Sequence, residues 1–542
     1  MAGPPEPLYF LLRYPAMDHI GPPLAHFRCM STTKPAKSQL FLLLILSAIP
    51  RIIGAFWLPN AFGDAYAYTE QVYYMRRALL MGTFSQSNLF GFWLPLYQFI
   101  CAVVSALIGS PFYVPKIISA LSGAGVCLLV FLLTFELTAN KSLALVSFTL
   151  VALNPYHLLY SSAAMTDIPH AFFILLCAHC CIKDRWLLAA LCGLAAGLMR
   201  IESWSLVLII PVLQALHTRR LSVLACITLL LGPAFWLYVS WKAGGSPWRY
   251  FEIRNTYIVE TLAASPWLAT FPPWRVGLDL LRLVYTTQPM VLFACCLSLT
   301  LAMRELQLRG LRHRISSECI LLVFFFAHLT FLLLAYFTRN QPEIWPRYGL
   351  IFFTLGLPVL AAQLLRKHAT TGLSISDSFK DASLRLANIV LMVLFGLQFC
   401  IQLIEVTRTT VKSDPNKIVA EFLEDQRLAD RSLKVYCEDG AIRVLSGIPL
   451  EEFKDQYNSP NDTESFLRSL RENQIRLLVY KDLPGSRLAE IIKEIRSGKA
   501  GSARSSSKGI TLEEVTLRPR RKANDGIVLY RVHDNEMASS SR

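Results

Sequence analysis

Two aspartates stand where apolar stretches end, in a part of the chain that has few acidic residues. Asp64 lies in NAFGDAYAYTEQVYYMRR, after the first apolar run, and Asp167 lies in SSAAMTDIPH. Two carboxylates that converge on one face could provide a general base and a group that orients a hydroxyl or holds a cation. For each aspartate alone, a helix N-cap is the structural alternative.

Basic residues accompany these aspartates. Lys116 opens an apolar run, Arg200 stands two residues before Glu202 in MRIESW, and Arg347 lies in WPRYG. Arginine can bind phosphate with two parallel hydrogen bonds, so Arg347 and Arg200 are the best candidates to hold an anion. For any one of these cations, snorkelling beside an aromatic belt is the structural alternative. The same applies to four arginines that stand among tryptophans and tyrosines further along, namely Arg249, Arg254, Arg275 and Arg282.

The composition indicates a membrane protein with several spans. Apolar residues make up 54% of the 542 residues and charged residues 17%, whereas a soluble globular protein carries about 25% charge. Disordered chains, collagens and small disulfide scaffolds are excluded. The net charge is 53 − 38 = +15, but the basic residues sit mostly at the ends of apolar runs. The charge therefore does not indicate a nucleic-acid partner.

Eleven apolar runs are interpreted as membrane spans. Basic clusters fall at every second junction between them, and the positive-inside rule places those junctions in the cytoplasm. The apolar run 92–109 breaks this alternation, so we interpret it as juxtamembrane, like the amphipathic stretch 65–80. The sequence thus predicts an all-α bundle of about 11–13 spans with outward juxtamembrane helices. The spans are 38–58, 117–138, 143–162, 168–182, 186–199, 203–216, 221–241, 289–304, 318–337, 347–365 and 386–405.

These assignments divide the chain into three parts. A cytoplasmic leader occupies 1–37, the membrane domain occupies 38–405, and an extracytoplasmic domain follows at 406–542. The membrane domain includes two large outer loops, 59–116 and 242–288. The last part alternates three short strand-like stretches with helical ones, which is typical of a small α/β domain. The predicted strands are 434–437, 475–480 and 527–532, and the helical stretches are 416–429, 463–473 and 487–496. The 13 cysteines show no spacing that matches a closed zinc site.

The order of these motifs resembles a known family. FGDAYAY follows the first span, PLY stands at 95–97, and a lysine leads the second span; LNPYHLLYSSAAMTDIP (153–169), MRIESW and WPRYG follow. Together they resemble the GT-C integral-membrane glycosyltransferases of the family 39 or aminoarabinose-transferase type, over roughly residues 38–365. Many relatives have an acidic residue and a lysine where this chain has Trp93 and Leu94, so it lacks that phosphate-binding or metal-binding element.

The resemblance implies an inverting glycosyltransferase that uses a polyprenyl-phosphate sugar on the outer face of the membrane. Asp64 would be the catalytic base, and Asp167 would orient the acceptor or tune Asp64. The acceptor would be a hydroxyl of a protein, a lipid or a glycan. No cofactor is required and no metal is demanded, although a divalent cation is compatible with the site. The candidate site residues are Asp64 and Asp167 as catalytic groups, with Arg347, Arg200, Glu202, Lys116, Tyr348 and Tyr68 as substrate-binding groups.

Two other classes of protein fit the spans. A transporter or lipid flippase would use the same outward charges as a permeation path, but such proteins usually show inverted repeats and charges at mid-membrane. No internal repeat is visible in this sequence. A structural or assembly protein would use the C-terminal domain as its working part. The enzyme interpretation places the chain in a bacterial inner membrane, with its active site outside the cytoplasm.

Overall fold

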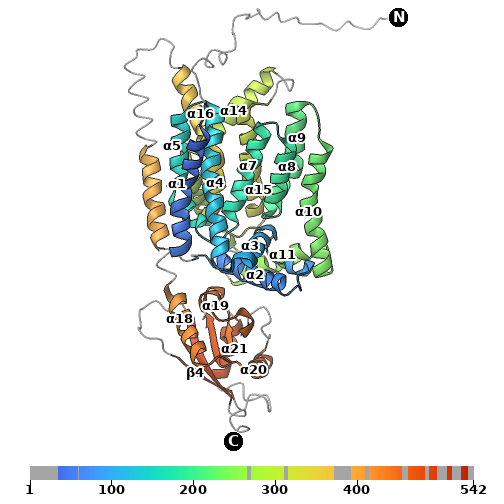
Figure 1. Cartoon of the computed structure of the whole chain (residues 1–542), viewed down its shortest axis with the longest axis vertical. Coiled ribbons are helices and arrows are strands. Elements are labelled where there is room, and N and C mark those ends of the chain that lie inside the picture. Colours follow the sequence, from blue (N-terminus) through green and yellow to red (C-terminus); the bar gives the residue numbers. More distant parts are fainter. Residues whose placement is uncertain are drawn as a thin grey trace, which may run out of the picture.

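The computed structural model has a bundle of apolar helices and, at one end of it, a small α/β unit (Figure 1). The predicted leader 1–37 falls almost entirely outside the described part of the chain. The residues that the structure describes are 34–58, 60, 62–264, 270–309, 315–370, 392–408, 414–454, 462–481, 487–496, 510–515 and 527–534.

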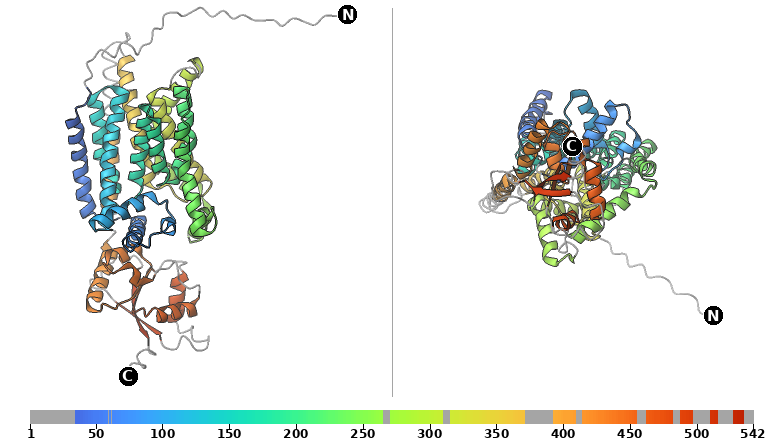
Figure 2. Two further views of the ribbon diagram at one scale, coloured as in Figure 1. Left: turned by 45° about the vertical axis from the view of Figure 1, so that its right-hand side comes forward. Right: turned by 90° about the horizontal axis from the view of Figure 1, so that it is seen from below.

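The helices of the bundle match the apolar runs of the sequence. The long helices stand side by side, and their ends alternate between the two sides of the bundle (Figures 1 and 2), with α5 and α6 forming one bent pair. An unlabelled helix over 392–408 completes the set. The labelled helices are α1 (Lys37–Trp57), α4 (Tyr113–Thr138), α5 (Lys141–Ala152), α6 (Pro155–Ser161), α7 (Asp167–Ile182), α8 (Trp186–Gly197), α9 (Leu206–Thr218), α10 (Val223–Gly244), α14 (Pro289–Arg309), α15 (Ser317–Phe337) and α16 (Pro346–Thr370).

Fewer helices qualify as spans by length than the eleven that were predicted. Within the described residues, six are long and apolar enough to cross a membrane, or up to eight if each of two bent pairs is one span. The predicted count also includes α7, with 16 residues, α8, with 12, and the helix over 392–408. At 1.5 Å per residue, a helix of 12 residues covers only about 18 Å of a ~30 Å core.

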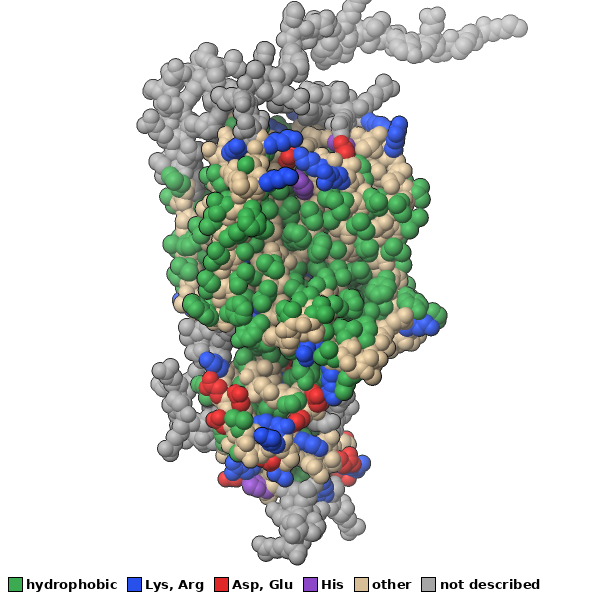
Figure 3. Space-filling model, viewed as in Figure 1, with side chains coloured by type: hydrophobic (Ala, Val, Ile, Leu, Met, Phe, Trp, Pro, Cys, Tyr) green, Lys and Arg blue, Asp and Glu red, His purple; other side chains and the backbone are tan. Residues whose placement is uncertain are grey.

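The outer surface of the bundle is apolar. Large hydrophobic side chains are exposed along α1, α10 and the helix over 392–408, and they form a continuous belt (Figure 3). A surface of this kind is stable in lipid and not in water. The protein is therefore an integral membrane protein.

A buried arginine holds the break between α5 and α6, which are bent by 63°. Arg51 of α1 is fully buried, and its Nη2 donates to the carbonyls of Val151 and Ala152 at 3.4 Å each and to Nδ1 of His157 at 2.8 Å. Carbonyls at the end of a helix lack partners within the helix, and a cation there also complements the helix dipole. Sequence analysis did not single out Arg51.

We expect Arg51→Met to lower the stability of the protein by about 1–3 kcal/mol, because it removes a buried donor from the carbonyls at the end of α5 and from His157. The measurement is thermal unfolding in detergent. Arg185→Met, which changes an exposed arginine at the start of α8, is the matched control and should leave the melting temperature unchanged. An equally stable Arg51→Met protein would show that the break in the span needs no cap.

Five shorter helices lie at the end of the bundle that faces the α/β unit (Figures 1 and 2). The predicted juxtamembrane runs 65–80 and 92–109 are both among them, and the second is not long enough to qualify as a span. Their placement agrees with the prediction that neither run crosses the membrane. The helices are α2 (Gly63–Leu80), η2 (Gln86–Leu89), α3 (Leu96–Ile108), α11 (Arg249–Ala264) and α13 (Pro273–Thr287).

The C-terminal unit is a five-stranded sheet with helices on both faces, in the strand order β2-β1-β3-β5-β4. β1 pairs in parallel with β2 and β3, and β5 pairs antiparallel with β3 and β4. The three predicted strands correspond to β1, β3 and β5, whereas β2 and β4 were not predicted. The elements are α18 (Asp414–Ala429), β1 (Val435–Cys437), α19 (Gly440–Leu445), η4 (Leu450–Glu452), β2 (Phe453–Lys454), α20 (Thr463–Glu472), β3 (Leu477–Lys481), α21 (Arg487–Arg496), β4 (Ile510–Glu514) and β5 (Ile527–Asp534).

Alternate residues of the strands build two cores. Tyr436 and Leu478 pack under α20 and α21, while Val435 and Leu477 pack under α18 and α19. This follows from the two-residue period of a strand, which places neighbouring side chains on opposite faces. The central strands β1 and β3 are almost continuously apolar, because helices cover both faces of the sheet.

Candidate active site

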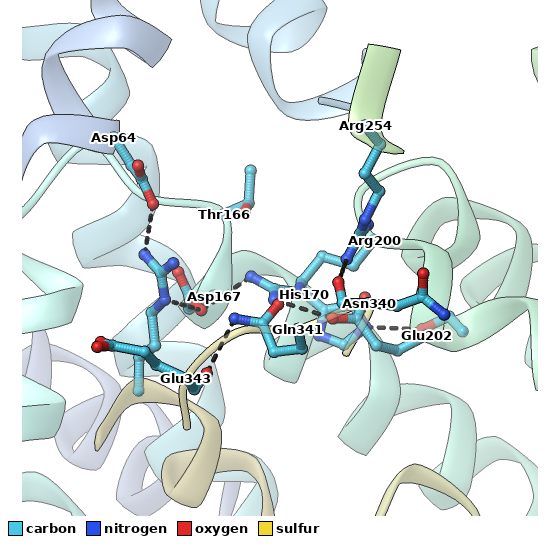
Figure 4. A network of polar contacts seen from close by, with 12 residues as sticks. Asp64, Thr166, Asp167, His170, Arg200, Glu202, Arg254, Asn340, Gln341 and Glu343 are labelled. Carbon is cyan, nitrogen blue, oxygen red and sulfur yellow. Dashed lines mark hydrogen bonds and ion pairs between the residues drawn. The ribbon is translucent and has the colours of Figure 1, made fainter. Parts of the chain in front are cut away.

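A cavity of about 580 Å³ opens where the short helices meet the end of the bundle. Its wall comes from six separate segments: the start of α2, the chain at 92–94, Tyr160 of α6, the chain at 199–202, α11, and the chain at 340–348. The apolar lining is interrupted by charged side chains (Figure 4). A concave site of this size, with a few converging polar groups, is the usual form of a ligand-binding site.

The charged residues form a chain of alternating sign. Nη1 of Arg347 donates to Oδ2 of Asp64 at 2.7 Å, and its Nε lies 3.9 Å from Oδ1 of Asp167. Nη1 of Arg200 donates to the same Oδ1 at 2.9 Å, and its Nη2 donates to Oε1 of Glu202 at 3.0 Å. The structure thus brings together five of the residues that the sequence singled out, and each arginine lies between two carboxylates.

Neither aspartate acts as a helix cap. The N-cap of α2 is Phe62 and that of α7 is Thr166, and neither makes a side-chain cap. Asp64 and Asp167 lie in the first turns instead, with their carboxylates directed at arginines. The two aspartates therefore do not serve as the helix N-caps that were considered as the alternative to a functional role.

The two aspartates differ in their access to a ligand. The side chain of Asp64 is 41% exposed and lines the cavity, whereas that of Asp167 is 8% exposed. Oδ2 of Asp167 is buried and has no hydrogen-bond partner among the described residues. Asp64 is accordingly the carboxylate that can reach a substrate, while Asp167 lies behind the arginines and holds them.

Two tyrosines support the charged chain. The guanidinium groups of Arg200 and Arg347 each lie 5.5 Å from the centre of the Tyr348 ring, a distance at which an aromatic face attracts a cation. Tyr68 shares a hydrogen bond of 3.0 Å with Oγ1 of Thr166. Burial raises the pKa of the Tyr68 phenol, so this side chain stays neutral near pH 7.

Lys116 is not brought to the cavity. Its Nζ donates to the carbonyl of Leu58 at 2.6 Å and lies 5.4 Å from the centre of the Phe112 ring. The side chain is buried and does not belong to the cavity wall. In this position it ties the start of α4 to the end of α1.

A further arginine, Arg254 of α11, points into the cavity (Figure 4). Nη1 donates to the Tyr250 hydroxyl at 3.4 Å and Nη2 to the carbonyl of Asn340 at 3.5 Å, both long for hydrogen bonds. No carboxylate of the described residues lies within ion-pair distance of Arg254. It differs in this from Arg200 and Arg347, which already share carboxylates.

A second polar network holds the chain at 340–345 against the cavity. Asp279 of α13 is fully buried and accepts from Arg275 at 3.3 Å, Arg282 at 3.2 Å and Tyr336 at 3.0 Å. Arg275 also donates to Glu343 at 2.5 Å. These partners compensate the buried charge of Asp279, so the network serves to hold the structure together. It fixes the part of the cavity wall that carries Asn340.

Comparison with known proteins identifies the fold. Residues 41–238 match the family model for dolichyl-phosphate-mannose-protein mannosyltransferases. The structure is similar to that of ArnT from Cupriavidus metallidurans in the apo state, with a TM-score of 0.54, 14% identity, and 91% of this chain and 97% of that chain covered. The chain has the GT-C fold.

A second ArnT structure from the same organism, bound to undecaprenyl phosphate, gives a TM-score of 0.52 with 13% identity, covering 92% of this chain and 98% of that one. No curated protein sequence matches significantly. The predicted resemblance to GT-C membrane glycosyltransferases is confirmed, and the fold and the family model together indicate a glycosyltransferase.

Trp93 and Leu94 lie in the wall of the cavity. These are the positions at which, by the family resemblance of the sequence, many relatives have an acidic residue and a lysine. Trp93 packs on Tyr68 with ring centres 4.6 Å apart. This part of the wall is therefore apolar, whereas Arg254, which has no carboxylate of the described residues within ion-pair distance, comes from α11. Sequence analysis grouped Arg254 with other loop arginines, because a local pattern does not show which of them points inward.

The acidic side chains of the cavity are partners of arginines. Within the described ranges, no group of three or more His, Cys, Asp and Glu side chains is arranged to hold a metal ion. The carboxylates of the cavity are each bonded to arginine instead.

Proposed function

We propose that this protein is an inverting glycosyltransferase that moves a sugar from a polyprenyl-phosphate donor to an acceptor hydroxyl. The observation that carries the proposal is one cavity with both an exposed carboxylate, Asp64 held by Arg347, and Arg254, a cation with no carboxylate of the described residues within ion-pair distance. The GT-C fold and the undecaprenyl phosphate in the ArnT structure support a lipid-phosphate donor.

The reaction needs a base and a means of stabilising the leaving group. Asp64 takes the proton of the acceptor hydroxyl as its oxygen attacks the anomeric carbon. The bond from that carbon to the phosphate oxygen breaks, and the lipid phosphate leaves with both electrons. A single displacement of this kind inverts the anomeric centre. Arg347 holds Asp64 in place, and Asp167 holds Arg347.

The phosphate is best assigned to Arg254. Arg347 and Arg200 were the candidates from the sequence, but each is already shared between two carboxylates. A guanidinium without a carboxylate partner gains more from a phosphate than one that must give up an existing ion pair. Arg200 contributes to the positive field that stabilises the leaving group.

We expect Arg347→Ala to lower kcat by about 10²-fold, because a carboxylate displaced by about 1 Å loses much of its effect. The sequence alone suggested a role in donor binding, which would raise the donor KM instead. Measuring kcat and donor KM separately distinguishes the two. Arg366→Ala, at the other end of α16 and paired with Glu318, is the matched control. A higher donor KM at unchanged kcat would return Arg347 to the donor site.

The cavity and the C-terminal unit are proposed to face away from the cytoplasm. The basic junctions lie at the opposite end of the helices (Figure 1): Lys141 begins α5, Lys183 follows α7 and Arg220 follows α9. Lys and Arg side chains gather at that end of the bundle (Figure 3). The positive-inside rule assigns that end to the cytoplasm. For a bacterial inner membrane, the reaction would take place on the extracytoplasmic side.

The test is sugar transfer by the purified full chain in detergent, from a panel of radiolabelled polyprenyl-phosphate sugars. Release of polyprenyl phosphate together with a glycosylated acceptor supports the proposal and identifies the donor. The panel of acceptors includes a protein hydroxyl, a lipid and a glycan. A folded protein that consumes no donor but moves labelled lipid between leaflets of a vesicle would instead be a transporter or flippase.

A further inference from the structure

One helix, α2, connects the cavity to the C-terminal unit. Asp64 and Tyr68 are four residues apart and both line the cavity, as expected for positions on one helix face. Glu70 follows Tyr68 by two residues, which turns it about 200° around the helix axis. Glu70 therefore points away from the cavity and toward the C-terminal unit.

Glu70 forms a two-pronged (bidentate) ion pair with Arg443 of α19. Nε of Arg443 donates to Oε1 at 2.6 Å and Nη2 donates to Oε2 at 2.8 Å. The two side chains are only 7% and 14% exposed. Nη1 of Arg443 also donates to the carbonyl of Cys437 at 2.8 Å, at the end of β1. The ion pair thus fastens α2 to the sheet, across 373 residues of sequence.

The other polar contacts of this interface are more exposed. Arg77 of α2 lies 2.5 Å from Glu451, with the two side chains 41% and 38% exposed, and the Tyr73 hydroxyl donates to Glu451 at 3.0 Å. Exposed ion pairs contribute little because water screens them, whereas breaking a buried pair leaves a charge without compensation. The orientation of α2 at the interface therefore depends chiefly on Glu70 and Arg443.

We propose that Arg443 is a positioning residue of the active site: through Glu70, the C-terminal unit fixes α2 and thereby sets Asp64 and Tyr68 in the cavity. This inference rests on the proposed glycosyl transfer. It gives the C-terminal unit a part in the reaction, although none of the residues described in that unit lines the cavity. The donor phosphate is bound from α11 and so depends less on α2.

The test compares Arg443→Ala with Arg77→Ala in the full chain, the second variant being a control in the same interface. Arg443→Ala should lower kcat by about 10- to 100-fold through displacement of Asp64, with the donor KM much less affected. Arg443→Lys, which keeps the charge but not the two-pronged geometry, should be intermediate. Hydrogen exchange should become faster at residues 63–70 and stay unchanged in α16. Arg77→Ala should behave like the wild type.

Unchanged kcat and unchanged exchange at 63–70 in a folded Arg443→Ala protein would overturn the proposal. If that variant does not fold, Glu70→Gln and the reversed pair, Glu70→Arg with Arg443→Glu, replace it. Recovery of activity in the reversed pair supports the inference, and a reversed pair as inactive as Glu70→Gln overturns it. If the wild type transfers no sugar at all, the proposed function fails, and hydrogen exchange at 63–70 alone decides whether Arg443 positions α2.

Discussion

Replacing Asp64 by asparagine is expected to abolish sugar transfer, with a loss of about 10²–10⁴-fold or more from the missing base. Asparagine has nearly the same shape and still accepts the hydrogen bond that Arg347 donates to Asp64 at 2.7 Å. It cannot take the proton of the acceptor hydroxyl. The measurement is turnover of the radiolabelled donor by wild type and variant at equal protein concentration. Donor binding should be retained, because Arg254 is unchanged.

Asp184→Asn is the matched control for this experiment. Asp184 is as exposed as Asp64, at 41%, and its Oδ1 also has a nitrogen partner, Nε2 of His217 at 3.1 Å, but at the opposite end of the bundle. The control should keep full activity. A loss of activity in Asp64→Asn would then be specific to that position and not a general effect of removing one exposed carboxylate. Full activity in a folded Asp64→Asn protein would remove Asp64 from the reaction and leave the buried Asp167 as the remaining candidate base.

Replacing Arg254 by glutamine is expected to raise the donor KM by roughly 10- to 100-fold. A hydrogen bond to a charged group contributes about 1.5–3 kcal/mol, and each ~1.4 kcal/mol changes affinity tenfold. The effect on kcat should be smaller, because Asp64 and Arg347 stay in place. The measurement is initial rate against donor concentration, with binding of polyprenyl phosphate as an independent readout.

Arg249→Gln is the control on the same helix. Arg249 is exposed and pairs with Glu252 at 3.1 Å, one turn before Arg254, and it does not line the cavity. Its replacement should leave the donor KM unchanged. An equal rise in KM for both variants would indicate a general effect of positive charge near the membrane surface, and no rise in Arg254→Gln would assign the phosphate to Arg200 or Arg347.

Much of the fold could be predicted from local patterns. Apolar runs predict helices in lipid, and basic junctions predict which ends share a side; together they placed the run 92–109 at the membrane surface instead of across it. The strands β1, β3 and β5 were predictable because they are short, apolar and separated by helical stretches. β2 and β4 were missed, the first because it has two residues and the second because it is polar at the edge of the sheet.

Part of the candidate site could also be predicted from local patterns. Sidedness is a local property, so Asp64, Asp167, Arg200 and Arg347 could be assigned to one end of the bundle from the sequence alone. Their actual partners could not, because the contact between Arg347 and Asp64 spans 283 residues. No periodicity connects positions that far apart.

The sequence by itself determined the membrane class, the order of the spans and the end at which the charged residues gather. Only the tertiary structure decided which of these residues face one cavity. It directed Lys116 to a backbone carbonyl, left Arg254 without a carboxylate partner, and fastened Glu70 to Arg443. The physical reason is that a side chain's electrostatic partner depends on how distant helices pack, and several packings are compatible with the same apolar pattern.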